Sequence, residues 1–146
     1  MADGAAEPGP WLTNDAGGHV SLLGGWSPTS GRHHFPPAHR CPYSGADDVE
    51  VVALPRTGSL WAWTAVTSAP PGYEGPVPYG FGVVELDGVD LRVVGRLTEP
   101  DPSALREGQR MVVTTETMPG GLVVWAFAPE NRADLADLAD QPEAVV

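Results

Sequence analysis

The sequence predicts a mainly β protein whose larger part is a five-stranded barrel. Its 18 glycines and 16 prolines favour short elements joined by turns. Five runs rich in β-branched and aromatic residues follow one another between Gly58 and Ala128, separated by turn residues. A chain of 146 residues can bury one core. We therefore expect one barrel with short accessory segments.

The N-terminal segment, residues 1–21, is expected to be a flexible tail that leads into a short docking helix. Residues 1–10 are small, acidic and proline-containing, so they have too little apolar surface to offset the entropy of ordering. Residues 11–23 are ambiguous, because glycines at positions 17, 18, 24 and 25 keep any helix brief.

The next segment, residues 22–57, contains two short motifs of the same form. S-P-T-S-G begins at Ser27 and C-P-Y-S-G begins at Cys41. With Ser30 and Ser44, these positions have the layout of a rubredoxin-like zinc ribbon in which three of the four cysteines are serine. Zinc binds deprotonated sulfur or imidazole, and a serine hydroxyl does not ionise near neutral pH. We expect a degenerate zinc ribbon without bound zinc.

A rival metal site is conceivable from His33, His34 and His39, which lie near Cys41 in the sequence. Imidazole nitrogens could replace the lost sulfurs. However, side chains of adjacent residues in an extended chain point in opposite directions, so His33 and His34 are poorly placed to share an ion. The alternative is a solvated basic loop.

The barrel is expected to span residues 58–129. Its first strand is residues 59–68, which the prolines at positions 70 and 71 terminate. Residues 79–86 and 90–97 flank Asp87-Gly88, a turn pair that supplies a positive φ at glycine, so these runs should form a hairpin.

A short helical turn is predicted within residues 99–108, because an aspartate cap and a proline precede it and a glycine ends it. Residues 110–118 and 122–128 are the last two strands, joined by a Pro-Gly-Gly turn. Five strands with a helical turn between the third and fourth is the element order of an OB-fold. Residues 130–146 are expected to be an acidic tail.

Charge and composition exclude several classes of protein. The chain has 19 acidic residues against 8 basic ones, all arginine, and a net charge of −11, which argues against a nucleic-acid partner. A single cysteine cannot form an internal disulfide. The sequence contains neither a secretion signal nor an apolar run near the ~20 residues of a membrane span. We expect a cytoplasmic protein without membrane contact.

The combination of these motifs resembles the DUF35 family, zinc-ribbon plus OB-fold proteins associated with thiolase-type enzymes and acyl-CoA metabolism. The resemblance is carried by the two knuckle motifs, by Phe35-Pro36-Pro37 between them, and by GSLWAWTAV from Gly58, PYGFGVVELDG from Pro78, EGQRMVV from Glu107 and VVWAFAP from Val123. The serines at positions 27, 30 and 44 depart from the family's zinc-binding pattern.

The resemblance implies a non-catalytic subunit of a thiolase-like acyl-CoA or acyl-carrier complex, whose catalytic partner is an acyltransferase, a thiolase or an aldolase. Such a subunit scaffolds the catalytic subunits in a hetero-oligomer and lines the access path for acyl-CoA, a candidate ligand. The zinc that the family usually carries is structural, and because three of its four ligand positions are serine here, we expect no cofactor in this chain.

Contacts with a partner or with acyl-CoA are expected at aromatic residues and arginines. Aromatic side chains are enriched in interfaces, and guanidinium groups pair with phosphate oxygens. Trp61 and Trp63 alternate with Leu60 and are predicted to share one face of the first barrel strand. The candidate residues are Arg32, Phe35, Pro36, Pro37, Arg40, Trp61, Trp63, Tyr73 and Tyr79.

Two other functions compete with the subunit role. A free-standing OB-fold module could bind acyl-CoA or, less in keeping with the charge, stack single-stranded bases on its aromatic residues. An enzyme would need an activated nucleophile, and Cys41, followed by proline, has no helix N-terminus aimed at it. None of the familiar hydrolase, metalloprotease or nucleotide-binding motifs is present. We therefore expect no catalytic residues.

Overall fold

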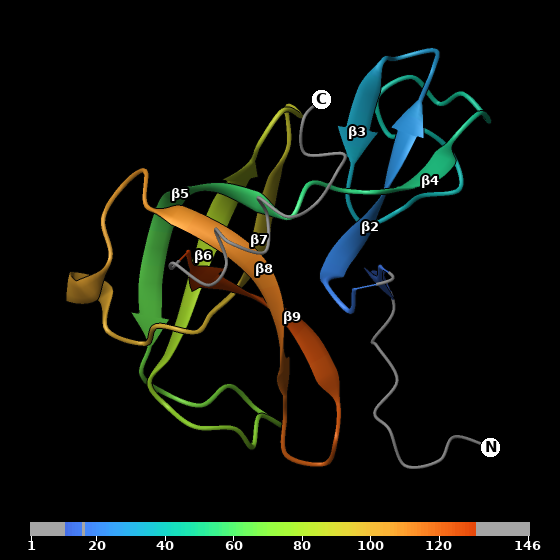
Figure 1. The fold of residues 1–146 in the computed structure, drawn as a ribbon. Helices are drawn as coiled ribbons and strands as arrows, with labels where there is room; N and C mark the ends of the chain where they lie inside the picture. Colours follow the sequence, from blue (N-terminus) through green and yellow to red (C-terminus); the bar gives the residue numbers. More distant parts are fainter. Residues whose placement is uncertain (1–10, 16, 131–146) are drawn as a thin grey trace.

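The computed structural model describes residues 11–15 and 17–130, which form a small N-terminal sheet beside a closed β-barrel (Figure 1). The tails expected at residues 1–10 and 131–146 lie outside the described residues. No helix in the described part of the chain is long and apolar enough to cross a membrane.

The barrel has the strand order β5-β6-β7-β9-β8 and closes between β8 and β5. All neighbours are antiparallel except β7 and β9, which run parallel. The predicted helical turn is a single 3-10 turn between β7 and β8. This arrangement confirms the predicted OB-fold. The elements are β5 Thr57–Val66, β6 Tyr79–Leu86, β7 Arg92–Leu97, η1 Pro102–Ala104, β8 Arg110–Thr117 and β9 Val123–Pro129.

Strand alternation in the barrel separates a buried inner face from a solvated outer face. On β6, the residues at positions 80, 82, 84 and 86 are buried, and Phe81 and Glu85 between them are exposed. The predicted turn between β6 and β7 is present, with Gly88 at a φ of 75°. The inner side chains meet in a core that includes Leu60, Leu97 and Phe127.

The N-terminal sheet corrects one prediction, because residues 12–27 form a β-hairpin where a short helix was expected. Leu12 on β1 faces Leu22 on β2 across the hairpin, and both side chains are buried. A helix could not place these two residues side by side in the core. The sheet consists of β1 Leu12–Asn14, β2 Val20–Ser27, β3 Arg32–His34 and β4 Glu50–Ala53. It therefore begins within the segment that was assigned to tail and helix.

Glycine is needed in the middle of β2, where two other side chains occupy the space of a Cβ atom. A Cβ on Gly24 would lie 2.8 Å from the methyl groups of Leu54, and one on Gly25 would lie 2.3 Å from Nε2 of His34. The same glycines that made a helix doubtful thus allow a tightly packed strand.

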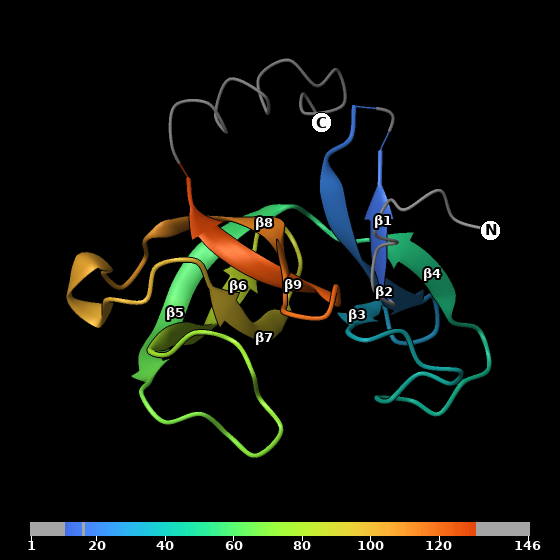
Figure 2. The ribbon, with the colours of Figure 1, turned by 90° about the horizontal axis from the view of Figure 1, so that it is seen from below.

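The sheet and the barrel share one core and lie side by side (Figure 2). Leu54 packs with barrel residues, and Arg56 donates from Nε to the carbonyl of Val20 over 3.0 Å. Three aromatic rings complete this joint: Trp11, Phe35 and Trp125 meet edge to face, with centroids 5.3–6.1 Å apart. The N-terminal sheet is thereby fixed against the barrel.

Candidate functional site

The structure brings together the four positions that would hold zinc in a zinc ribbon. Two turns with the same hydrogen bond hold them: Gly31 donates to the carbonyl of Ser27 over 2.7 Å, and Gly45 donates to that of Cys41 over 2.8 Å. Both glycines have a positive φ. The Cys41 thiol donates to Oγ of Ser30 over 3.4 Å. We call these two turns, residues 27–31 and 41–45, the knuckle.

Asp48 ties the first turn of the knuckle together. Its carboxylate accepts a 2.6 Å hydrogen bond from the hydroxyl of Ser27, which is fully buried, and two more from the backbone N–H and hydroxyl of Thr29, at 3.0 and 2.7 Å. The bond from Ser27 and then those from Thr29 lower the pKa of Asp48. Sequence reasoning missed Asp48, since no local pattern links it to Ser27, 21 residues earlier.

The side chains of the knuckle fit one another better than they fit a zinc ion. Burial raises the pKa of the Cys41 thiol, but hydrogen bonds with the side chains of Ser30 and Ser44 and with the backbone outweigh burial and lower it to about 6. A thiolate there would be a ligand, but the other three positions offer only hydroxyls, which do not ionise at neutral pH. The donor set therefore does not fit a closed zinc site.

The three neighbouring histidines do not converge on Cys41. His34 is buried, its ring packs against Gly25, and Nε2 accepts from the backbone N–H of Ala38 over 3.1 Å. His33 turns the other way, 6.4 Å from the ring of Trp26, and His39 is exposed. Within residues 11–15 and 17–130, no group of three histidine, cysteine or acidic side chains could hold a metal ion. Burial, and secondarily the charge of His33, lowers the pKa of His34.

The candidate contact residues of the knuckle divide into surface and interior positions. Arg32 stacks its guanidinium 3.9 Å from the ring centroid of Tyr43, and Arg40 donates to the carbonyl of Gly45 over 3.1 Å, so both are surface groups held against the knuckle. Phe35, however, is half-buried and belongs to the aromatic joint with the barrel.

The two prolines after Phe35 shape the chain that leaves the joint. Pro36 is exposed, Pro37 is half-buried, and the Phe35-Pro36 peptide bond is cis. Of the expected contact segment, only Pro36 is fully at the surface.

Trp61 and Trp63 do not share a face, which corrects the prediction for the first barrel strand. The register of β5 against β6 shifts between Leu60 and Ala62, so a bulge contains Trp61 as an extra residue. Trp63 therefore turns inward, packs against the core and donates from Nε1 to the carbonyl of Pro102 over 3.0 Å. Trp61 alone points outward, with 48% of its surface exposed.

The outer side of β5, β6 and β7 carries an exposed apolar surface. Trp61, Phe81 and Val94 are 48%, 39% and 48% exposed, and they come from these three adjacent strands. The guanidinium of Arg92 lies 4.1 Å from the ring centroid of Trp61 and pairs through Nε with Glu85 at 3.0 Å. The charges at the edge of this apolar surface therefore cancel. We call the surface formed by Trp61, Phe81 and Val94 the outer face.

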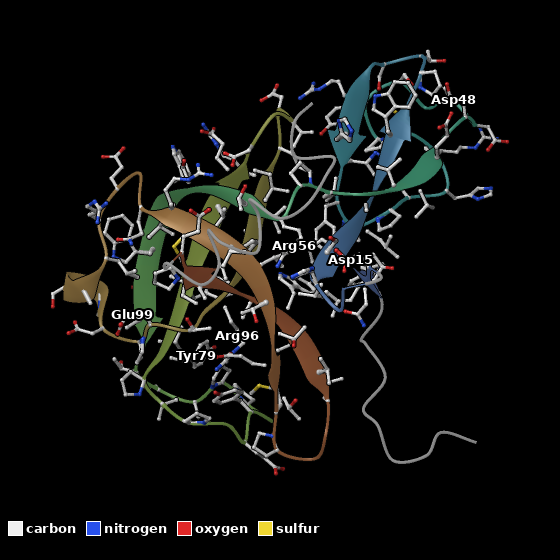
Figure 3. The ribbon with its side chains drawn as sticks, viewed as in Figure 1. Asp15, Asp48, Arg56, Tyr79, Arg96 and Glu99 are labelled. Carbon is white, nitrogen blue, oxygen red and sulfur yellow. The ribbon has the colours of Figure 1, made fainter. Side chains whose placement is uncertain are left out.

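Next to the outer face, a pocket of about 260 Å³ opens between the loop after β5 and the turn between β8 and β9. The guanidinium of Arg96 pairs through Nε with Glu116 at 2.6 Å and through Nη1 with the hydroxyl of Tyr73 at 3.3 Å, and it stacks 4.5 Å from the ring centroid of Tyr79. Burial lowers the pKa of Arg96, but Glu116 and Tyr73 raise it overall. Figure 3 shows Arg96 and Tyr79 on the barrel, away from Asp48 in the loop between β3 and β4.

We call this the Arg96 pocket; its lining residues are Pro76, Arg96, Glu116, Thr117, Met118 and Pro119. Sequence reasoning selected Tyr73 and Tyr79 but missed Arg96 and Glu116. Arg96 on β7 and Glu116 on β8 are 20 residues apart in the sequence, and β9 lies between their strands, so no local sequence pattern indicates the pair.

Three comparisons with known proteins agree with one another. Residues 51–116 match the family model described as ChsH2, C-terminal OB-fold domain. The chain is 27% identical over 110 residues to a DUF35 domain-containing scaffold protein of Pyrococcus furiosus, and the match covers 73% of this chain and 79% of that protein. A solved structure described as Ltp2-ChsH2(DUF35) aldolase is similar in fold, with a TM-score of 0.61 and 24% identity, over 75% of this chain and 84% of that one.

Proposed function

This chain is a relative of the DUF35 family, as its motifs predict, and we propose that it is a non-catalytic subunit that docks onto an aldolase or thiolase-like enzyme. In the finer form of the proposal, the partner is an acyltransferase, a thiolase or an aldolase that acts on acyl-CoA or acyl-carrier substrates. The chain scaffolds the catalytic subunits in a hetero-oligomer and lines the path by which acyl-CoA enters.

The names of the similar proteins support this role. The relative from Pyrococcus furiosus is described as a scaffold protein. The solved structure is described as an aldolase that combines Ltp2 with a ChsH2 DUF35 protein. Because the OB-fold hosts many functions, the likeness of fold alone would not select this one, and the surface of the chain must supply the rest.

The observation that carries the proposal is the outer face of the barrel. Three large apolar side chains from adjacent strands are exposed together in a chain whose net charge is −11. Contiguous apolar surface with aromatic residues is typical of protein interfaces. Covering Trp61, Phe81 and Val94 with a partner would remove this surface from water at a gain of about 25 cal/mol per Å².

The arginines near the outer face argue against a nucleic-acid ligand. Arg92 is paired with Glu85 and Arg96 with Glu116, so neither guanidinium is available to replace the counterions of a phosphate backbone. The remaining charge of the chain is strongly acidic. The aromatic residues are better suited to protein contacts than to base stacking.

The environment of Cys41 supports an accessory role over catalysis. A nucleophilic thiol must be activated, by a base or by a lowered pKa, and its substrate must be able to reach it. Cys41 is 2% exposed, and its thiol is hydrogen-bonded to the hydroxyl of Ser30. Although its pKa is low, a substrate has no access to it.

Co-expression tests the proposal. The chain is produced with the thiolase-like or aldolase-like enzyme whose gene adjoins its own, and the mixture is passed over a size-exclusion column at micromolar concentration. We expect one peak that contains both proteins. Two independent peaks would contradict the subunit role, and so would turnover of an acyl-CoA by the isolated chain, with Cys41→Ala as the check on that activity.

A free-standing acyl-CoA-binding module is the second candidate, and the Arg96 pocket favours it because the pocket is preformed without a partner. Calorimetry of the isolated chain with acyl-CoA separates the two functions. Binding of acyl-CoA by a chain that forms no complex supports the module; binding only by the complex supports the subunit.

A further inference from the structure

The Arg96 pocket lies where OB-folds bind their ligands. In this fold, the outer side of the second and third strands and the loops after the first and fourth strands form the usual binding surface. The corresponding parts here are β6, β7, the loop of residues 67–78 and the turn of residues 118–122. Arg96 on β7, Pro76 in the loop and Met118 at the turn all line the pocket.

The floor of the pocket is rigid before any ligand arrives. Glu116 and Tyr73 hold two of the three guanidinium nitrogens of Arg96, and Tyr79 supports its flat side. The hydroxyl of Tyr73 in turn donates to the carbonyl of Pro76 over 2.7 Å, which ties the loop to the floor. A ligand therefore loses little free energy to ordering the protein.

The pairing of Arg96 with Glu116 selects against charged ligands. The two side chains are only 15% and 28% exposed, and their opposite charges cancel at the floor. An anion would approach the carboxylate of Glu116, and a cation would approach the guanidinium of Arg96. Either ligand would be repelled by the partner of like charge, and that partner stays in place because separating a 2.6 Å ion pair in a partly buried site is costly.

What remains available is one donor beside one acceptor. Within the part of the chain that the structure describes, Nη2 of Arg96 and Oε2 of Glu116 take part in no hydrogen bond. Thr117, which carries a hydroxyl, also lines the pocket. A secondary amide needs this combination, since its carbonyl accepts and its N–H donates. The apolar walls, Pro76, Pro119 and Met118, suit the carbons on either side of an amide.

We propose that the Arg96 pocket binds a secondary amide within an uncharged extended chain, and that it excludes phosphate and carboxylate groups. A volume of about 260 Å³ accommodates an amide with its neighbouring carbons. Such amides occur in pantetheine, the arm of coenzyme A and acyl carriers, and in a peptide backbone. The proposal does not depend on the subunit role, because the pocket is formed by this chain alone.

The methyl group of Met118 provides a direct probe. The chain contains three methionines, of which Met111 is fully buried in the core and Met118 lines the pocket. The full-length protein is labelled at the methionine methyl carbons, and Met118→Leu assigns the signal. Pantetheine, N-acetylglycine N-methylamide and adenosine 3′,5′-bisphosphate are each titrated to about 10 mM, a range that detects weak binding.

We expect the signal of Met118 to shift and saturate with at least one of the two amides, while Met111 stays in place and the bisphosphate has no effect. Saturation by pantetheine alone identifies the cofactor arm as the ligand, and saturation by the peptide analogue alone identifies a peptide. No shift with either amide overturns the proposal, as does a shift with the bisphosphate as large as that with the amides.

A matched pair of variants tests the role of the carboxylate. Glu116→Gln should weaken amide binding about tenfold, because it replaces a charged acceptor by a neutral one. Glu85→Gln breaks the similar pair with Arg92 outside the pocket and should leave binding unchanged. Equal effects of the two variants would overturn the proposal. The titration uses the chain without a partner, so an absence of amide binding would not contradict the subunit role. Likewise, an absence of complex formation would not contradict the amide site.

Discussion

Replacing Ser27 by alanine should destabilise the protein through the knuckle. The hydroxyl of Ser27 is buried and donates to Asp48 over 2.6 Å, and this bond closes the turn that a zinc ion would close in a ribbon with four cysteines. Ser27→Ala removes the donor and leaves the shape of the side chain otherwise the same. The variant therefore measures how much the hydrogen bond between Ser27 and Asp48 contributes to the free energy of unfolding, in a turn that a zinc ion would otherwise hold.

The magnitude follows from the geometry of that bond. A hydrogen bond to a charged group contributes about 1.5–3 kcal/mol to the free energy of unfolding. With an unfolding entropy of about 2.1 cal/mol/K per residue over about 120 residues, this loss lowers the melting temperature by about 6–12 °C. Ser44→Ala is the control, because Ser44 is exposed and bonds to the backbone of Ala46 over 3.3 Å and to the thiol of Cys41, whereas the bonds to the carboxylate of Asp48 come from Ser27 and Thr29. Its effect should be within about 0.5 kcal/mol.

Thermal unfolding followed by circular dichroism, with and without a chelator, gives the answer. We expect Ser27→Ala to melt well below Ser44→Ala, and the chelator to change neither. Equal melting temperatures for the two variants, or a large fall in the parent protein on chelation, would refute the reasoning. The effect should also depend on pH: because its partners lower the pKa of Asp48, the stabilisation is complete above the ordinary value of 3.8 and is lost as the pH falls below it.

The remaining predictions concern packing and ionisation. Gly25→Ala should cost about 1–3 kcal/mol in a denaturant titration, because its methyl group would lie 2.3 Å from the buried ring of His34. Since burial lowers the pKa of His34, the unfolded state binds more protons below pH 6.5, so stability should decline as the pH falls below that value, and His34→Gln should flatten the decline. Trp63→Phe should cost about 1–2 kcal/mol through the lost bond to Pro102, whereas Trp61→Phe should change the melting temperature little; the reverse order would contradict the bulge.

The barrel could be predicted because its signals are local. Alternation within each strand, the Asp87-Gly88 turn and the helical turn after residue 99 are all visible in short windows of sequence. The bulge at Trp61 could not be predicted, because a bulge depends on how β5 pairs with β6. Without the bulge, strict alternation along the strand assigns Trp63 to the wrong face of the sheet.

The N-terminal hairpin and the sites depend on contacts between distant residues. Glycines 24 and 25 make a helix improbable by propensity, but only the positions of His34 and Leu54 explain why a strand forms there. The same holds for the pair formed by Arg96 and Glu116, which are 20 residues apart. The serines of the knuckle were identified from spacing, but the carboxylate of Asp48, which bonds to Ser27 and Thr29 from a distant position in the sequence, could not be.

Docking through the outer face is tested most directly by a pair of matched valine variants. Val94 on the outer face and Val51 on β4 are 48% and 62% exposed, so an aspartate fits at either position without disturbing the core. The dissociation constant of each variant for the co-purifying enzyme is measured by calorimetry. Val94→Asp should weaken the complex at least about tenfold, and Val51→Asp should leave it within about twofold of the parent. Equal affinities for the two variants would contradict docking through this face.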